Sequence, residues 1–95
     1  MTPREFKLRG NAELFPQKGG WFYVRVPARI TNATKHLADR GLVAVSATVG
    51  DSSWNTSLLP MGDGSQFVAL PAKVRKKERI AVGGRVTLTL RLRDR

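Results

Sequence analysis

The clearest pattern in the chain is a strict alternation of apolar and polar residues over residues 85–93. Successive side chains of a β-strand point to opposite faces, so this spacing predicts a half-buried strand. Its inner face would carry Val86, Leu88, Leu90 and Leu92, and its outer face Arg85, Thr87, Thr89, Arg91 and Arg93. We interpret the arginines first as protection of an edge strand against aggregation, and alternatively as a second basic surface.

Five more segments have strand-like composition and are bounded by turn residues. They are residues 6–14, which Gly10 interrupts, and residues 21–26, 42–49, 54–59 and 66–70. Turn chemistry at residues 50–53 and 60–64 predicts a hairpin and a second reversal of the chain. Within residues 21–26, we expect Phe22, Val24 and Val26 to face the core, with Trp21, Tyr23 and Arg25 on the opposite side.

Two short helices are predicted between these strands. Pro27 and Pro71 each occupy a position where a helix can begin, and the helices would extend over residues 27–37 and 71–77. Gly41 and the glycines at 83–84 are expected to end them.

The strand, proline, short helix, glycine and second strand occur twice, with Pro27 and Pro71 44 residues apart. We interpret this as an internal duplication with units at about 21–49 and 66–93, because neither unit could bury its apolar face alone. The expected fold is all-β. It is a small barrel of about six to seven strands with two short helices and a pseudo-twofold axis, in a single domain over residues 1–95. One chain then supplies both halves, so we expect a monomer.

Composition narrows the classes of protein to which the chain can belong. Its 95 residues fit one domain, and its 41% hydrophobic content is too high for a disordered basic tail. It has no Cys, which excludes disulfides and thiolate–metal sites. No apolar run is long enough to span a membrane, and residues 1–7 lack the apolar stretch of a signal peptide. We therefore expect a cytoplasmic protein with no membrane partner.

The net charge of +10 is unevenly distributed along the chain. Residues 41–70 contain no Lys or Arg, whereas residues 71–95 contain nine. The predicted second helix therefore supplies the best candidate site, for nucleic acid or another polyanion. Its candidate residues are Lys73, Arg75, Lys76, Lys77 and Arg79, with Arg29 at the position equivalent to Lys73 in the first unit. A twofold axis could join Arg29 and Lys73 into one surface. The alternative is a solvated face that keeps a small protein soluble.

Aromatic residues suggest a second, weaker site. Trp21, Tyr23 and Trp54 could form a stacking platform for bases, and Trp54 with Asn55, Thr56 and Arg75 could line a pocket at the barrel mouth. In so small a barrel, packing of these rings into a second hydrophobic layer is the favoured interpretation.

Signatures of catalysis are weak. His36 is the only histidine, and we expect it to be an exposed helix residue rather than a catalytic base or a ligand. Asp51 and Asp63 lie in turn contexts, where Asp commonly bonds its own backbone. We therefore expect a protein that is not an enzyme and that uses no metal or cofactor.

The segment from Phe67 to Lys76, followed by Ile80, Val82, the glycines at 83–84 and Val86, resembles the swapped-hairpin half-barrels of AbrB- and MazE-type transcription factors. Those proteins dimerise and bind DNA, and they usually have Asp where this chain has Gly84. Nearly the whole chain resembles a bacterial family known as domain of unknown function nineteen-oh-five. The resemblance rests on the strand at Phe6, Trp21, the helix start at Val26–Pro27, Val43, Val45, and residues 54–60, 62–64, 70–71 and 74–76. It implies a double-split β-barrel within one chain and leaves the activity open.

Three functions follow from these patterns. The first is a non-catalytic module that binds nucleic acid or another polyanion. The second is a small-molecule-binding or catalytic domain, and the third is a structural or protein-interaction module.

Overall fold

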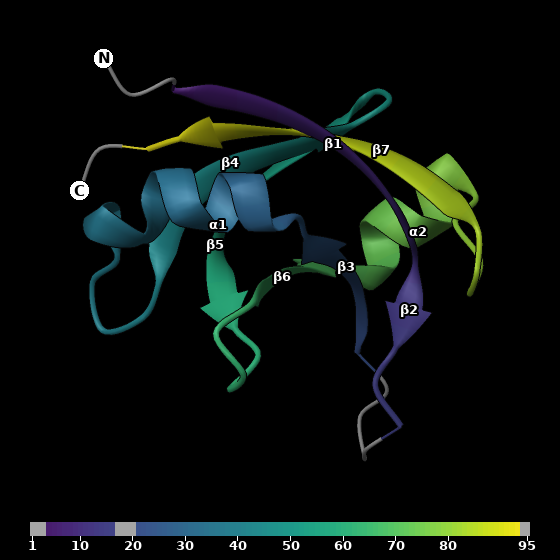
Figure 1. The fold of residues 1–95 in the computed structure, drawn as a ribbon. Coiled ribbons are helices and arrows are strands. Elements are labelled where there is room, and N and C mark those ends of the chain that lie inside the picture. The colour runs from purple at the N-terminus through teal and green to yellow at the C-terminus, as the bar shows by residue number, and fades with distance from the viewer. Residues whose placement is uncertain (1–3, 17–20, 94–95) are drawn as a thin grey trace.

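The computed structural model describes residues 4–16 and 21–93. Within these ranges the chain forms seven strands, two short α-helices and one 3₁₀ helix, η1 (Figure 1). The elements are β1 (Glu5–Asn11), β2 (Glu13–Leu14), β3 (Phe22–Val26), α1 (Ala28–Thr34), η1 (Lys35–Leu37), β4 (Val43–Val49), β5 (Ser52–Pro60), β6 (Gln66–Leu70), α2 (Ala72–Glu78) and β7 (Arg85–Leu92). The predicted all-β class with two short helices is confirmed.

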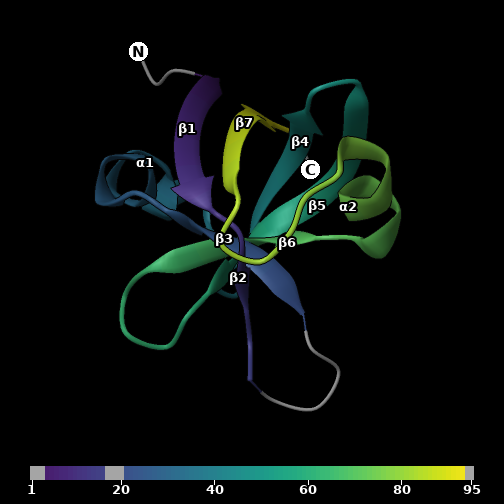
Figure 2. The ribbon, with the colours of Figure 1, turned by 90° about the vertical axis from the view of Figure 1, so that its right-hand side faces the viewer.

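The strands form one antiparallel sheet in the order β1-β7-β4-β5-β6-β3-β2. The first and last strands of this order are consecutive in the chain, with only Ala12 between them. Ala12 bonds through its N–H to the carbonyl of Gly84 (2.8 Å) and through its carbonyl to the N–H of Gly83 (2.7 Å). The sheet therefore curls until its two edges meet at one bent strand (Figure 2).

The predicted break in the first strand lies at Ala12, not at Gly10. Gly10 pairs with Val86 inside β1. A Cβ atom at position 10 would lie 2.7 Å from Cγ1 of Val24, and β1 and β3 are in contact. The glycine therefore allows these two strands to approach each other where the sheet curls.

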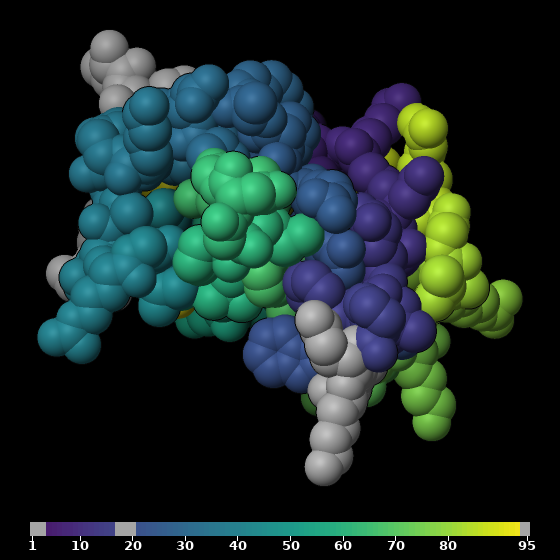
Figure 3. All heavy atoms as spheres, turned by 60° about the horizontal axis from the view of Figure 1, so that its bottom comes forward, coloured from purple at the N-terminus to yellow at the C-terminus, as the bar shows by residue number. Residues whose placement is uncertain are grey.

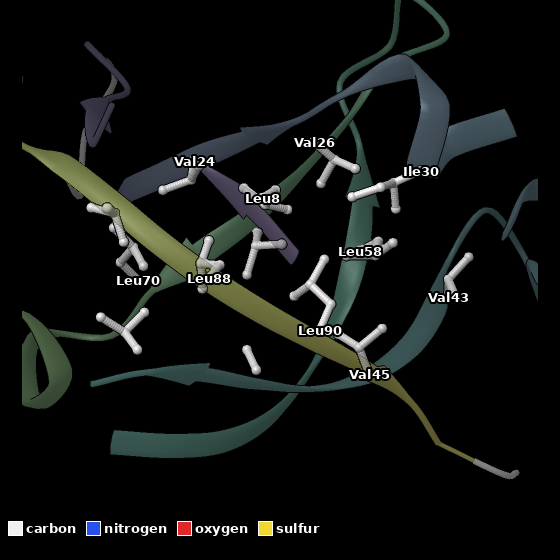
Figure 4. Close-up of a cluster of buried hydrophobic side chains, with 14 of the residues drawn as sticks. Leu8, Val24, Val26, Ile30, Val43, Val45, Leu58, Leu70, Leu88 and Leu90 are labelled. Atoms are coloured by element: carbon white, nitrogen blue, oxygen red, sulfur yellow. The ribbon is translucent and has the colours of Figure 1, made fainter. Parts of the chain in front are cut away.

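One hydrophobic cluster fills the inside of the curl (Figure 4). The alternation in β7 is confirmed, because its four inward residues are buried and Arg85 and Arg91 are exposed. β7 itself lies between β1 and β4, so the interpretation of its arginines as edge protection is wrong. The buried cluster comprises Leu8, Ala12, Val24, Val26, Ile30, Val43, Val45, Ala47, Val49, Leu58, Val68, Leu70, Val86, Leu88, Leu90 and Leu92.

The strand pairing relates the two units by an approximate twofold axis. Val24 pairs with Val68, the residue 44 positions later, and 44 is also the spacing of Pro27 and Pro71. Ala47 pairs with Leu90, 43 positions later, which is the spacing of Gly41 and Gly84. In both pairs a residue of the first unit faces the equivalent residue, its counterpart, in the second unit. An approximate twofold axis through the two pairs therefore exchanges β3 with β6 and β4 with β7.

The same register extends each unit further toward the N-terminus than the sequence pattern indicates. Tyr23 and Phe67 are counterparts, and their partners are Glu13 and Leu59. The bent strand of β1 and β2 is therefore the counterpart of β5. The units cover about 5–49 and 52–92, so the boundaries at 21 and 66 leave out the first strand of each.

The two helices begin alike and end differently. Pro27 and Pro71 are N-caps with nearly identical backbone angles, φ −61° and ψ 150° against φ −63° and ψ 150°. α2 ends at Arg79, which has left-handed φ and ψ of 56° and 47°, so the prediction that the glycines at 83–84 end this helix is wrong. The reversal at Arg79 returns Ile80 to the protein, where it packs against the core cluster. Similarly, α1 is followed directly by η1, and this helical segment ends at Leu37, before Gly41.

No helix in the described ranges combines the length and apolar character that crossing a membrane requires.

Candidate anion-binding surface on helix α2

Helix α2 presents most of its basic side chains to solvent. Val74 is buried and faces the protein, while Lys73, Lys76, Lys77 and Arg79 are exposed. Figure 3 shows long side chains from this light-green part of the chain projecting away from the body of the molecule. We call α2, with Arg79 and the two grooves beside it, the α2 surface.

The positive charges of this surface are not neutralised by neighbouring acids. Over residues 4–16 and 21–93, no carboxylate oxygen lies within 4.0 Å of the charged nitrogens of Lys73, Lys76, Lys77 or Arg79. The acid of the helix, Glu78, is engaged elsewhere, because its Oε2 accepts a hydrogen bond of 2.7 Å from Oγ of Ser52. The lysines therefore keep their full attraction for external anions.

Arg75 differs from the lysines because the fold holds its guanidinium in place. Its Nε donates to the carbonyl of Leu70 (3.1 Å), and its Cζ lies 3.9 Å from the centre of the Phe22 ring. The residue is half-buried, and its two Nη groups make no hydrogen bond within the described part of the chain. Such a guanidinium can bind an oxyanion with little further loss of side-chain entropy.

Two grooves flank the start of α2 and share Pro71. The first has a volume of about 230 Å³ and is lined by Trp21, Phe22, Ala69, Leu70, Pro71, Ala72 and Arg75. The second has a volume of about 390 Å³ and is lined by Asp51, Ser52, Ser53, Trp54, Pro71, Lys73, Val74 and Lys77. The predicted pocket residues Trp54 and Arg75 thus line neighbouring grooves, and neither groove includes the exposed Asn55 or the half-buried Thr56.

The three rings of the predicted stacking platform have different environments. Tyr23 is only 5% exposed, stacks on Phe15 at 4.0 Å between ring centres and meets Phe67 edge to face. Trp54 packs against the core cluster, and its buried Nε1 has no partner among the described residues. Packing is therefore confirmed for Tyr23 and Trp54, while Trp21 is 57% exposed.

Arg29 does not join the α2 surface. Its Nη2 donates to the carbonyl of Lys7 (2.6 Å), which ties α1 to β1. Both ribbon views place α1 and α2 on opposite sides of the curled sheet (Figures 1 and 2). The twofold axis separates Arg29 from Lys73, so the expectation of one joined basic surface is wrong.

The outward-facing arginines of β7 and the residue after it, Arg93, differ in their contacts. Nε of Arg93 donates to the carbonyl of Val45, and its Nη2 donates to the carbonyl of Thr56, both at 2.9 Å. These bonds tie the end of β7 to β4 and β5. Arg85 and Arg91 remain exposed on the outer face.

The two pseudo-equivalent helices differ sharply in charge. α2 contains four basic residues and one acid, whereas α1 contains only Arg29. The counterparts of Arg75, Lys76 and Lys77 are Thr31, Asn32 and Ala33, and the counterpart of Trp21 is Ser65. Both helices occupy equivalent places in the same fold, so the fold itself does not require this concentration of cations.

Two other candidates have the roles expected of them. Oδ1 of Asp63 accepts hydrogen bonds from Oγ (2.5 Å) and N–H (3.0 Å) of Ser65, and these bonds lower the pKa of Asp63 below its ordinary 3.8. His36 is exposed in η1. Over the described ranges, no group of three or more His, Cys, Asp and Glu side chains could hold a metal ion.

Comparison with known families gives a match over most of the chain. A family model described as Domain of unknown function (DUF1905) matches residues 11–90. A comparison with curated proteins gives no match.

Proposed function

The chain belongs to the DUF1905 family, whose description names no function, and from this premise we propose that it is a non-catalytic module that binds a polyanion through the α2 surface. The observation that supports the proposal best is the difference between the two ends of the duplicated fold. Cations without acidic partners gather on α2, while the equivalent helix α1 has one basic residue. Charges needed only for solubility would have no reason to favour one end.

The shape of the surface favours a polymer over a small ligand. The two grooves share Pro71 and lie beside the start of α2. The first, at about 230 Å³, is smaller than the roughly 300–1,000 Å³ that is usual for small-molecule pockets, and the second, at about 390 Å³, is near the lower end of that range. A polyanionic chain could follow both grooves and release its condensed counterions to solvent as Lys73, Lys76 and Lys77 neutralise its charges.

The proposal is tested by binding measurements with two charge-matched triple variants. One replaces Lys73, Lys76 and Lys77 with Gln, and the control replaces Lys7, Lys35 and Arg40, which are exposed and lie outside the α2 surface. The probe is a short mixed-sequence DNA strand followed by fluorescence anisotropy between about 50 and about 200 mM salt. The slope of log K against log salt should become shallower by about 2 in the α2 triple variant, at roughly 0.7 per lost phosphate contact.

The control triple variant should change this slope much less. Equal losses in both variants would show that net charge alone drives binding, and the proposal would be wrong. Absence of binding at low salt would also overturn it. Tight binding of inorganic phosphate without binding of the polymer would instead favour the small-molecule alternative.

We also propose that the fold is a double-split barrel of the kind found in AbrB- and MazE-type half-barrels, with both halves supplied by one chain. The pairing of Val24 with Val68 and of Ala47 with Leu90 supports this description. It implies a monomer, so light scattering after size exclusion should give a mass near 10.5 kDa. An obligate dimer would contradict it.

A further inference from the structure

We propose that the polyanion is a single-stranded nucleic acid, with one unpaired base stacked on Trp21 and an adjacent phosphate bound by Arg75. This inference rests on the proposed function and specifies its ligand. It is drawn from the juxtaposition of an exposed indole and a fixed guanidinium in one groove.

Trp21 is held in place but not covered. Its carbonyl accepts a hydrogen bond of 2.9 Å from the N–H of Phe15, which fixes its backbone at the start of β3. The residue nevertheless remains 57% exposed, while the neighbouring Tyr23 is buried by Phe15 and Phe67. An indole fixed at its backbone and open to solvent is suited to stacking with a base.

Arg75 lies across the same groove with free hydrogen-bond donors. The Phe22 ring lies over its guanidinium, 3.9 Å from Cζ to the ring centre, and the carbonyl of Leu70 accepts a hydrogen bond from its Nε. The Nη groups are therefore left for a ligand. Two Nη donors on a planar, permanently charged group match the oxygens of a phosphate. The groove thus combines a surface for a flat apolar ring with a donor pair for an oxyanion.

A nucleotide within a single strand carries both of these groups next to each other. In a duplex the bases are stacked on one another and paired, so their faces are not available to Trp21. Inorganic polyphosphate and heparin provide negative charge but no base. The lysines of α2 would attract all these polymers, whereas Trp21 would distinguish the single strand from the others.

The other end of the fold provides an internal comparison. The twofold counterparts of Trp21 and Arg75 are Ser65 and Thr31, which offer neither a ring nor a cation. The backbone at the two ends is equivalent, as the matching caps at Pro27 and Pro71 show. The indole and the guanidinium are therefore both confined to the end that also carries the lysines.

The test compares a short single strand, the corresponding duplex and inorganic polyphosphate with wild-type protein, Trp21→Ala and Trp21→Phe. Trp21→Ala should weaken single-strand binding by roughly 5- to 150-fold, the range for loss of one stacked base. Binding of duplex and of polyphosphate should stay within about twofold, because their attraction is electrostatic. Trp21→Phe should restore most of the affinity for the single strand.

A spectroscopic measurement follows the same contact. The chain contains two tryptophans, so a Trp54→Phe background isolates the emission of Trp21. The single strand should quench this emission and polyphosphate should not. The melting temperature of each variant shows whether it remains folded.

Equal affinities for the three polymers, unchanged by Trp21→Ala, would overturn this inference. If the α2 lysine variant still lost binding to all three polymers, the proposed polyanion-binding function would stand without the inference of a single-stranded ligand. Preference for the duplex would also overturn the inference. Absence of binding to any polymer would overturn both proposals.

Discussion

The guanidinium of Arg75 lies over the ring of Phe22, with 3.9 Å between its Cζ and the ring centre. The two residues come from different units of the duplicated chain, Phe22 from β3 and Arg75 from α2. They meet because Phe22 pairs with Leu70, whose carbonyl also accepts the hydrogen bond from Arg75. The position of the guanidinium therefore depends on the pairing of the two units.

Replacing Phe22 with Leu should reduce binding of a DNA single strand although no charge is lost. Leucine keeps most of the apolar volume but offers no ring face, so Arg75 loses a cation–π contact that contributes roughly 0.5–2 kcal/mol. We expect an affinity loss of several-fold by anisotropy. Phe6→Leu is the matched control, because Phe6 also packs partly buried against the core. Equal losses in both variants would contradict this role of Phe22.

Gly10→Ala should destabilise the protein. The new methyl group would lie 2.7 Å from Cγ1 of Val24, inside a closely packed contact between β1 and β3. We expect a loss of about 1–3 kcal/mol in the free energy of unfolding, measured with urea. Adding Val24→Ala should recover part of the loss, while Val26→Ala should not. A Gly10→Ala variant as stable as wild type would show that the strands can separate at no cost.

Thr31→Val and Thr34→Val should have opposite effects on stability. Both threonines are buried in α1, but Oγ1 of Thr34 donates to the carbonyl of Ile30 (2.8 Å), whereas Oγ1 of Thr31 has no partner among the described residues. Removing the hydroxyl of Thr34 should cost about 1 kcal/mol of stability, whereas removing the hydroxyl of Thr31 should be neutral or stabilising. Urea unfolding of the two variants tests the difference. Equal destabilisation would show that Thr31 is satisfied by a bound water.

The carboxyl of Asp63 should titrate below its ordinary pKa of 3.8. The hydroxyl of Ser65 is the largest cause, followed by the backbone N–H of Ser65. Ser65→Ala should therefore raise the pKa of Asp63 partway back, as measured by NMR titration of the carboxyl carbon. A folded pKa below the unfolded one stabilises the turn at pH above the unfolded pKa, and this stabilisation is lost as the pH falls through the folded pKa. An unchanged titration in Ser65→Ala would contradict this assignment.

The sequence predicts the elements of this fold well because their signals are local. The alternation in β7 and the two Val/Leu–Pro–Ala–basic segments each indicate their element without knowledge of distant contacts. The place of β7 between β1 and β4 depends on long-range pairing, which periodicity does not contain. Periodicity alone therefore favours an edge strand for these arginines, although β7 is interior.

The candidate site is partly predictable from the sequence, because the charge of α2 is also a local signal. A dense run of cations in a short helix is visible in the sequence, and the structure places it on an exposed face. The burial of Tyr23 depends on Phe15, which lies outside every predicted strand, and the hold on Arg75 depends on Phe22. The backbone reversal at Arg79 is hidden as well, because arginine gives no sign of a left-handed conformation.

Joining both units of the sheet in one polypeptide has a consequence for how this protein can change. In a homodimer built from one repeated half, each amino-acid replacement appears at both poles of the assembly. Here a replacement in α2 leaves α1 untouched, so one pole can specialise while the other keeps the framework intact. Tryptophan and lysine at one pole, opposite serine, asparagine and alanine at the other, are the outcome that such independence permits.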